Sequence, residues 1–442
     1  MTTRLKKYRW KELSAEERSA VLQRPAVKSN ESITAQAQAI IDRVRNDGDK
    51  ALTELAAELD KVELDNLKVS EAEAAEAAGL IGPGACKAID TAIANVRAYH
   101  EAQQPKPIVV ETTPGVVCER ITRAIPAVGL YVPAGSAPLP STAVMLAVPS
   151  EIAGCETRVL CTPARSDGKA DPAVVYAAWQ CGVRDIFKAG GAQAVAAMAY
   201  GTESVPKVDK IFGPGNAWFT AAKTLVSADP AGAALDMPAG PSEVMVVADD
   251  TAAPRAVALD LLSQAEHGPD SQVVLVTTSE ALADKADAAI DTALKTLPRA
   301  DIIVQALEFS LCVLVDSVEE AIDVANAYAS EHLIIQVADP RACLPRVNNA
   351  GSIFLGPWTP ESVGDYCSGT NHVLPTYGYA RSYSGLSLSA FQKTISVQEL
   401  TLDGLRTLEP TVTTLAGLEG LDAHAQAVLV RIEDADQENE NA

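Results

Sequence analysis

The chain has 442 residues, 48% of them hydrophobic, which predicts several buried cores and argues against a disordered protein. Its formal net charge of −22 argues against nucleic-acid binding, because no surplus of Lys and Arg exists to neutralise phosphates. No stretch reaches the roughly 18 consecutive apolar residues of a membrane span, and the first 20 residues lack the apolar segment of a signal peptide. We therefore expect a cytoplasmic, multidomain protein without a nucleic-acid or membrane partner.

The N-terminal third is predicted to be largely helical. Residues 1–30 form an expected helical extension, in which Ser14 and Glu17 fit a capping box. From residue 31 apolar side chains recur at helical spacing, and Gly48 separates two such stretches. The segment "QQPKPIVVETTPGVVCERI" then changes to strands and turns.

Two series of strands and helices follow. The first contains "VGLYVPAG", "TRVLCTP", "VRDIFKAG" and "VDKIFGPG", and the second contains "EVMVVAD", "SQVVLVT", "SLCVLV" and "HLIIQV". Each strand-like run precedes a helical stretch, which is typical of parallel sheets covered by helices. The sequence therefore predicts an α/β fold with two doubly wound, incomplete Rossmann-like parallel-sheet domains and helical extensions at both ends.

The expected boundaries place residues 31–130 and 236–384 in a first, discontinuous α/β domain and residues 131–235 in a second. Residues 385–442 are expected to form a C-terminal helical segment that ends in the acidic stretch "EDADQENENA". We expect that stretch to be disordered, since it has almost no apolar residues to bury.

Three glycine-bearing turns follow predicted strands: "VPAGS", "KAGGAQ" and "FGPGNAW". Ligands of parallel α/β sheets bind beyond the carboxyl ends of the strands. Gly213 and Gly215 would let the backbone approach a phosphate, and Asn216 lies at the start of the next helix. None of the three is a complete dinucleotide fingerprint, so each alone is better explained as an ordinary turn. Together they predict a ligand cleft without naming the ligand.

The stretch "LLSQAEHGP" carries a Gln and a His near the end of a predicted helix. Pro254 suits the first turn of that helix, and Gly268 with Pro269 are expected to end it at His267. Gln264 and His267 then share one face, where both can bind a cation. For this pair alone, a histidine that caps the last turn of the helix is the better explanation.

The other histidines stand beside carboxylates near the ends of predicted elements. His332 follows Glu331, His372 shares a loop with Asp365, and His424 lies near Glu419. These residues allow a zinc site and also a general base. Their spacing leaves both open, because among the four possible zinc ligands only Gln264 and His267 are close together in the sequence. The residues that the zinc site would use are Gln264, His267, Asp365 and His424, and the base would use Glu331 and His332.

From about residue 25 to 430 the sequence resembles the histidinol dehydrogenase family. The matching stretches are "GLYVPAGSAPLPSTAVMLAVPS", "GGAQAVAAMAYGT", "DKIFGPGNAW", "DMPAGPSEVMV", "DLLSQAEHGPDSQ", "SEHLIIQ" and "GDYCSGTNHVLPTYGYAR". The resemblance implies oxidation of L-histidinol to L-histidine through L-histidinaldehyde, with two NAD+ consumed and one zinc bound per subunit. These are the last steps of histidine biosynthesis.

The resemblance also assigns roles to individual residues. It implies that Glu331 and His332 are the catalytic acid/base pair, that residues 131–235 bind NAD, and that the first α/β domain carries the metal and catalytic residues. It implies a homodimer in which Glu419 and His424 complete the site of the partner. The implied zinc ligands are Gln264, His267, Asp365 and His424. The implied NAD contacts are Tyr131, Gln193 and Asn216. The implied substrate contacts are Ser242, His372 and Glu419, together with His332 and the four zinc ligands.

Three alternatives remain at this point. A paralogous dehydrogenase would oxidise another diol or amino alcohol, such as sulfopropanediol, on the same scaffold. A zinc hydrolase would use Glu331 to activate water and would bind no NAD. A non-catalytic nucleotide-binding module would leave the recurrent pairing of histidines with carboxylates unexplained.

Overall fold

The computed structural model describes residues 5–24, 31–134, 138–238 and 240–440. The chain divides into two compact units. The first comprises residues 1–103 and 125–391, and the second comprises residues 104–124 and 392–442. Both parallel sheets belong to the first unit.

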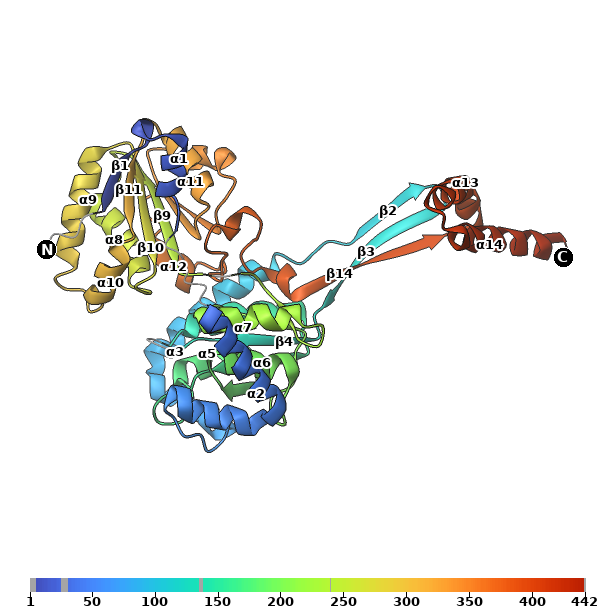
Figure 1. Ribbon diagram of the computed structural model, residues 1–442, viewed down its shortest axis with the longest axis horizontal. Coiled ribbons are helices and arrows are strands. Elements are labelled where there is room, and N and C mark those ends of the chain that lie inside the picture. Colours follow the sequence, from blue (N-terminus) through green and yellow to red (C-terminus); the bar gives the residue numbers. More distant parts are fainter. Residues whose placement is uncertain (1–4, 25–30, 135–137, 239, 441–442) are drawn as a thin grey trace. The chain divides into compact units, whose positions relative to one another are not determined.

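The first parallel sheet has six strands, and one of them, β12, begins at His332 (Figure 1). All its strands are parallel, in the order β1-β11-β10-β9-β12-β13. The side chains of β9 alternate between two cores, with Val244 and Val246 on one face and Met245 and Val247 on the other. The strands are β1 (Lys6–Arg9), β9 (Glu243–Ala248), β10 (Gln272–Thr277), β11 (Leu311–Leu314), β12 (His332–Gln336) and β13 (Ser352–Leu355).

Helices cover both faces of this sheet because both faces are apolar. Three helices contribute to the core around Val244, and α11 contributes to the core around Met245. The first three are α8 (Pro254–Ala265), α9 (Glu280–Ala293) and α10 (Ala300–Leu307), and α11 is Val318–Tyr328. Short elements of this region are η1 (Trp10–Glu12), α1 (Ala15–Val21), η3 (Arg341–Arg346), α12 (Glu361–Tyr366) and η4 (Tyr379–Arg381).

A five-stranded parallel sheet has the order β6-β5-β4-β7-β8. Helix α2 packs against α6 and α7, while α3 packs against α4 and α5 (Figure 1). The strands are β4 (Ala127–Tyr131), β5 (Thr157–Thr162), β6 (Asp185–Lys188), β7 (Lys210–Phe212) and β8 (Ala234–Leu235). The helices are α2 (Glu31–Leu55), η2 (Ala56–Asp60), α3 (Glu71–Glu101), α4 (Pro140–Ala153), α5 (Pro172–Gln180), α6 (Gly191–Tyr200), α7 (Ala217–Ala228) and η5 (Leu388–Phe391).

Apart from the added edge strand β1, the two sheets share one topology. In each, three successive strands extend to one side, and the chain then returns to the other side of the first strand. The reversal falls between β9 and β12 in one sheet and between β4 and β7 in the other. This arrangement confirms the predicted α/β fold with two doubly wound parallel sheets.

The second unit is an antiparallel three-stranded sheet followed by two helices. Its strand order is β14-β3-β2. Its elements are β2 (Ile108–Thr113), β3 (Val116–Ala124), β14 (Gln392–Leu400), α13 (Leu402–Glu419) and α14 (Asp422–Glu440).

Several expected boundaries are corrected by the structure. Residues 1–30 are not only helical, because β1 extends the six-stranded sheet beside β11. Residues 31–103 do not join the first α/β domain, because α2 and α3 bury their apolar faces on the helices of the five-stranded sheet. The segment 385–442 contains the strand β14 as well as helices.

The expectation that the acidic stretch after residue 432 is disordered is also corrected. It continues helix α14 as far as Glu440 and is not disordered there. The capping box at Ser14 and Glu17 is confirmed, since Glu17 N–H donates to Ser14 Oγ and Ser14 N–H to Glu17. None of the described helices is long and apolar enough to cross a membrane.

Candidate active site

Helix α8 brings Gln264 and His267 to the amino edge of the six-stranded sheet. It begins at Pro254, as expected, but its last helical residue is Ala265, and Glu266 caps it. His267 therefore lies just beyond the helix, with its N–H donated to the Gln264 carbonyl at 3.2 Å. Gln264 is buried while His267 is exposed, so the two side chains lie at different depths of one site.

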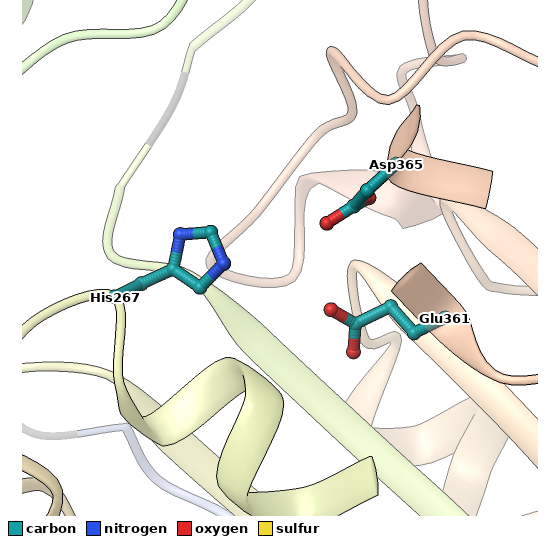
Figure 2. A group of neighbouring side chains, drawn as sticks. All are labelled: His267, Glu361 and Asp365. Carbon is teal, nitrogen blue, oxygen red and sulfur yellow. The ribbon is translucent and has the colours of Figure 1, made fainter. Parts of the chain in front are cut away.

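Two carboxylates from α12 face His267 (Figure 2). Glu361 begins this short helix and Asp365 follows one turn later, so both side chains lie on one face. One ligand atom from each of the three residues lies within 4.8 Å of the others. An imidazole and two carboxylates at this spacing are donors that a hard or borderline divalent cation takes.

Gln264 connects this cluster to His332. Its Nε2 donates to Glu361 Oε1 at 3.0 Å and lies 3.1 Å from His332 Nδ1. Its Oε1 is buried and accepts no hydrogen bond from the described residues. A buried amide oxygen without a donor is costly, so this atom is a candidate cation ligand.

Glu331 and His332 stand at the start of β12. Glu331 Oε2 accepts a hydrogen bond from the Glu243 N–H at 3.0 Å, and His332 Nε2 lies 3.4 Å from Asp365 Oδ1. Burial raises the pKa of the Glu331 carboxyl to about 7. Burial lowers the pKa of His332, but the surrounding carboxylates, Glu331 first, outweigh it and raise this pKa to about 10. The side chains around His332 are therefore predominantly acidic.

Burial and the neighbouring charges also shift the pKa values of the other titratable groups in the cluster. Burial raises the pKa of Glu361 to about 8. Burial disfavours the charged form of Asp365, but the hydrogen bond to His332 and three nearby imidazoles lower its pKa below the usual value. Burial lowers the pKa of His372. The imidazole of His267 keeps some solvent contact, but the protein atoms packed around it desolvate its charged form and lower its pKa as well. Such opposed shifts in one cluster are typical of functional sites.

Ser242 and His372 border this region. Ser242 directly precedes β9, and its carbonyl accepts a hydrogen bond from the Gln272 N–H at 3.2 Å. His372 lies on the loop after α12, and its Nε2 is buried without a hydrogen-bond partner among the described residues.

The residues expected to contact NAD follow the carboxyl ends of strands in the five-stranded sheet. Tyr131 ends β4, stacks on Phe219 with ring centroids 4.0 Å apart, and accepts a hydrogen bond from the Gly191 N–H at 3.0 Å. Asn216 caps α7 by accepting from the Phe219 N–H at 3.0 Å. Gln193 is buried in the first turn of α6 and contacts Asp60 at 3.4 Å.

Two of the glycine-bearing turns, "FGPGNAW" and "KAGGAQ", lie at the carboxyl edge of the five-stranded sheet. Gly213 has φ +123°, and a Cβ on it would lie 2.3 Å from the Tyr131 carbonyl oxygen, so only glycine fits. "KAGGAQ" runs from the last residue of β6 into the first turn of α6. Part of the third turn, residues 135–137 of "VPAGS", lies outside the described residues.

Glu419 and His424 belong to the second unit. Glu419 is the last residue of α13, His424 lies in the first turn of α14, and both are exposed.

Comparison with known proteins agrees with this geometry. The model of the family described as "Histidinol dehydrogenase" matches residues 22–432. A histidinol dehydrogenase from Photobacterium profundum is 54% identical over 429 residues, covering 97% of this chain and 96% of the relative. One from Yersinia pestis is 50% identical over 423 residues, covering 96% and 95%. The crystal structure of histidinol dehydrogenase from Elizabethkingia anophelis matches with a TM-score of 0.94 and 43% identity, covering 98% of this chain and 99% of the other.

The chain belongs to the histidinol dehydrogenase family. The resemblance seen in the sequence is confirmed, and the enzyme is an oxidoreductase. Membership of this family disfavours both the hydrolase and the non-catalytic alternatives. The predicted ligands Gln264, His267 and Asp365 come together, whereas the roles of His424 and Glu419 stay predictions.

Two residues of the site were missed by sequence reasoning. Glu361 stands four residues before Asp365 in "ESVGD", a helical spacing that could have revealed it. Glu243, whose backbone contacts both Glu331 and His332, had no such signal, because it resembles any first residue of a buried strand.

Proposed function

We propose that this enzyme carries out the zinc- and NAD-dependent four-electron oxidation of L-histidinol to L-histidine through L-histidinaldehyde, in histidine biosynthesis. One observation carries the proposal: in a chain of this family, Gln264, His267 and Asp365 converge beside Glu331 and His332. A cation-binding group thus adjoins a pair that can move protons.

The residues present fit a zinc ion. The orphaned Oε1 of Gln264, the imidazole of His267 and the carboxylate of Asp365 are oxygen and nitrogen donors that zinc accepts. His424 is the proposed fourth ligand, and Glu361 orients Gln264 through its 3.0 Å hydrogen bond. When bound, zinc supplies positive charge that anchors the imidazole and amine of the substrate and opposes the carboxylates around His332.

His332 acts on the alcohol. Its Nε2 lies 3.4 Å from Asp365 Oδ1. With zinc offsetting the carboxylates that keep the imidazole protonated, this atom would take the proton of the substrate hydroxyl. NAD+ supplies the acceptor for each hydride. Loss of one proton and one hydride converts the alcohol to L-histidinaldehyde.

Glu331 acts on the aldehyde. With a pKa of about 7, its carboxylate can take a proton from water near neutral pH as the water oxygen adds to the carbonyl carbon. The hydrated aldehyde then loses a second hydride and gives the carboxylic acid. Glu331 and His332 are adjacent in sequence, so one site serves both oxidations and retains the reactive aldehyde.

Other residues bind and orient the reactants. Ser242, His372 and Glu419 are the proposed substrate contacts, and Tyr131, Gln193 and Asn216 are the proposed NAD contacts. Support for the latter is their position near the carboxyl ends of strands in a doubly wound sheet, where nucleotides bind. We further propose a homodimer in which Glu419 and His424 complete the partner's site; both are exposed on their helices.

The test combines metal content with substrate choice. We expect purified enzyme to contain about one zinc per subunit and to form NADH from L-histidinol, with activity lost on chelation and restored by zinc. Asp365→Asn should lose both zinc and activity, while Asp301→Asn, an exposed control on α10, should keep both. Oxidation of sulfopropanediol in place of L-histidinol would contradict the proposal and favour the paralogous dehydrogenase.

A further inference from the structure

A buried ion pair joins Arg24 to Glu243. Arg24 Nε lies 2.5 Å from Glu243 Oε1, and Arg24 Nη2 lies 2.8 Å from Glu243 Oε2. The side chains are only 9% and 2% exposed. A planar guanidinium bound to a carboxylate through two parallel hydrogen bonds fixes orientation as well as charge.

The backbone of Glu243 faces both proposed catalytic residues. Its N–H donates to Glu331 Oε2 at 3.0 Å. Its carbonyl oxygen lies 3.2 Å from His332 Nδ1 and accepts a hydrogen bond from that nitrogen whenever Nδ1 carries a proton. A shift of this single residue would therefore displace the supports of both catalytic side chains.

Arg24 also holds the segment that leads into β12. Its Nη2 donates to the carbonyls of Tyr328 at 3.0 Å and Ala329 at 3.3 Å, and its guanidinium lies 3.9 Å from the centre of the Tyr328 ring. Ala329 ends α11 in the left-handed conformation, with φ +58°, two residues before Glu331. One guanidinium thus connects the start of β9 to the turn before Glu331 and His332.

The carboxylate of Glu243 receives a third N–H group. Tyr377 donates its N–H to Glu243 Oε1 at 2.6 Å. Tyr377 also has a left-handed φ of +58°, a conformation that costs a non-glycine residue about 1 kcal/mol or more and needs support from its surroundings. It follows His372 on the same loop, so the carboxylate also restrains a proposed substrate-binding segment.

We propose that Arg24 and Glu243 form a positioning pair that orients Glu331 and His332 for the reaction. This inference rests on the proposed function. A buried ion pair adds little net stability compared with apolar residues. Three N–H groups directed at one carboxylate nevertheless impose a geometry that apolar packing would not, and an error of about 1 Å in a catalytic group can cost about 100-fold in rate.

Glu243→Gln is the sharpest test. The substitution keeps shape but replaces one acceptor oxygen with an amide nitrogen that would face the N–H groups of Arg24 or Tyr377. We expect kcat for L-histidinol oxidation to fall about 10- to 100-fold, while KM for L-histidinol and for NAD+ changes by less than about threefold. Arg24→Lys should give an intermediate loss because Lys cannot bind both oxygens in parallel.

Chemical rescue of an Arg24 variant adds a measurement that would not change if the role of Arg24 were purely structural. In Arg24→Ala, guanidinium ion in the assay should restore part of kcat. Asp287→Asn is the matched control: Asp287 is buried, lies 3.3 Å from Lys7 and tethers the same N-terminal segment, but touches neither catalytic residue. Its activity per folded protein should stay within about twofold of the unmodified enzyme.

The outcomes are separable. If the unmodified enzyme does not oxidise L-histidinol, the proposed function fails. If it does, and Glu243→Gln keeps its kcat or loses activity only in step with Asp287→Asn, the positioning role is wrong while the function stands. If Glu243→Gln does not fold, Arg24→Lys and the guanidinium rescue decide by the same kcat criterion, and an unchanged kcat in Arg24→Lys overturns the inference.

Discussion

The six-stranded and five-stranded sheets share one topology but place their polar residues at opposite ends. In the five-stranded sheet, Tyr131 and Asn216 follow the carboxyl ends of β4 and β7, where ligands of doubly wound sheets bind. In the six-stranded sheet, Glu331 and His332 stand at the amino end of β12, beside the amino end of β9.

Helix direction explains what the two edges can bind. At the carboxyl edge of the five-stranded sheet, α6 and α7 begin, and the positive end of a helix favours phosphates. At the amino edge of the six-stranded sheet, α8 ends, and the negative end of a helix dipole favours a cation near His267. The same topology therefore provides an edge suited to anions in the five-stranded sheet, called the anion edge below. It provides an edge suited to cations in the six-stranded sheet, called the cation edge.

The largest effect is expected at the cation edge from Glu331→Gln. The amide oxygen can still accept a hydrogen bond from the Glu243 N–H, but the amide cannot take a proton from water. Oxidation of L-histidinaldehyde should slow by about 10²- to 10⁴-fold, with the first hydride transfer affected far less. Stopped-flow NADH absorbance separates the two transfers, and an equal loss in both would show that Glu331 does not act on the aldehyde step.

Glu361→Gln tests the carboxylate that orients Gln264. Zinc favours the ionised form of Glu361, which an amide cannot provide, so the substitution should weaken zinc binding about 10- to 100-fold. Competition with a chromophoric chelator measures this change. Glu308→Gln, an exposed control, should leave zinc affinity unchanged. Unaltered affinity in Glu361→Gln would separate this residue from the metal site.

Gly213→Ala tests the anion edge alone. A methyl group would lie 2.3 Å from the Tyr131 carbonyl oxygen, so the loop must move. We expect KM for NAD+ to rise about tenfold, as for a loss of roughly 1.4 kcal/mol of binding, without change in zinc content. Gly79→Ala on α3 meets no atom within 4 Å and is the control. Loss of zinc in Gly213→Ala would contradict the assignment of separate roles to the two edges.

The last effect concerns stability near the cation edge and leaves catalysis aside. Burial raises the pKa of Asp260 to about 6, and its Oδ2 accepts a hydrogen bond from Gln336 at 2.5 Å. Since the folded state holds this proton more tightly than the unfolded state, Asp260 penalises folding above pH 6, and the penalty disappears as the pH falls toward 4. Asp260→Asn should therefore gain stability relative to the unmodified enzyme as the pH rises from 4 to 6, by roughly 1–3 kcal/mol. Urea unfolding at several pH values measures the difference; a pH-independent difference would contradict the shift.

Much of this architecture could be predicted from the sequence because the buried strands are continuous apolar runs. The eight runs quoted above became β4–β7 and β9–β12. By contrast, β1 has the sequence KKYR, and nothing local shows that it pairs with β11, about 300 residues away. The partners of α2 and α3 were likewise misassigned, since an apolar helical face does not specify which sheet it covers.

The site shows the same limit. Gln264 and His267 were found because they are one helical turn apart, but their convergence with Asp365 depends on a fold that brings α8 beside α12. Glu243 was missed because it acts through its backbone, which every residue has. Side-chain chemistry can be recognised from residue types, whereas backbone support is visible only in three dimensions.

The central claim is that one site performs two successive oxidations beside a bound zinc. The most direct measurement is the amount of NADH formed from limiting L-histidinol with excess NAD+, with and without a chelator. We predict two NADH per L-histidinol, lost on chelation and restored by zinc. One NADH per L-histidinol, or a yield that chelation does not change, would contradict the account.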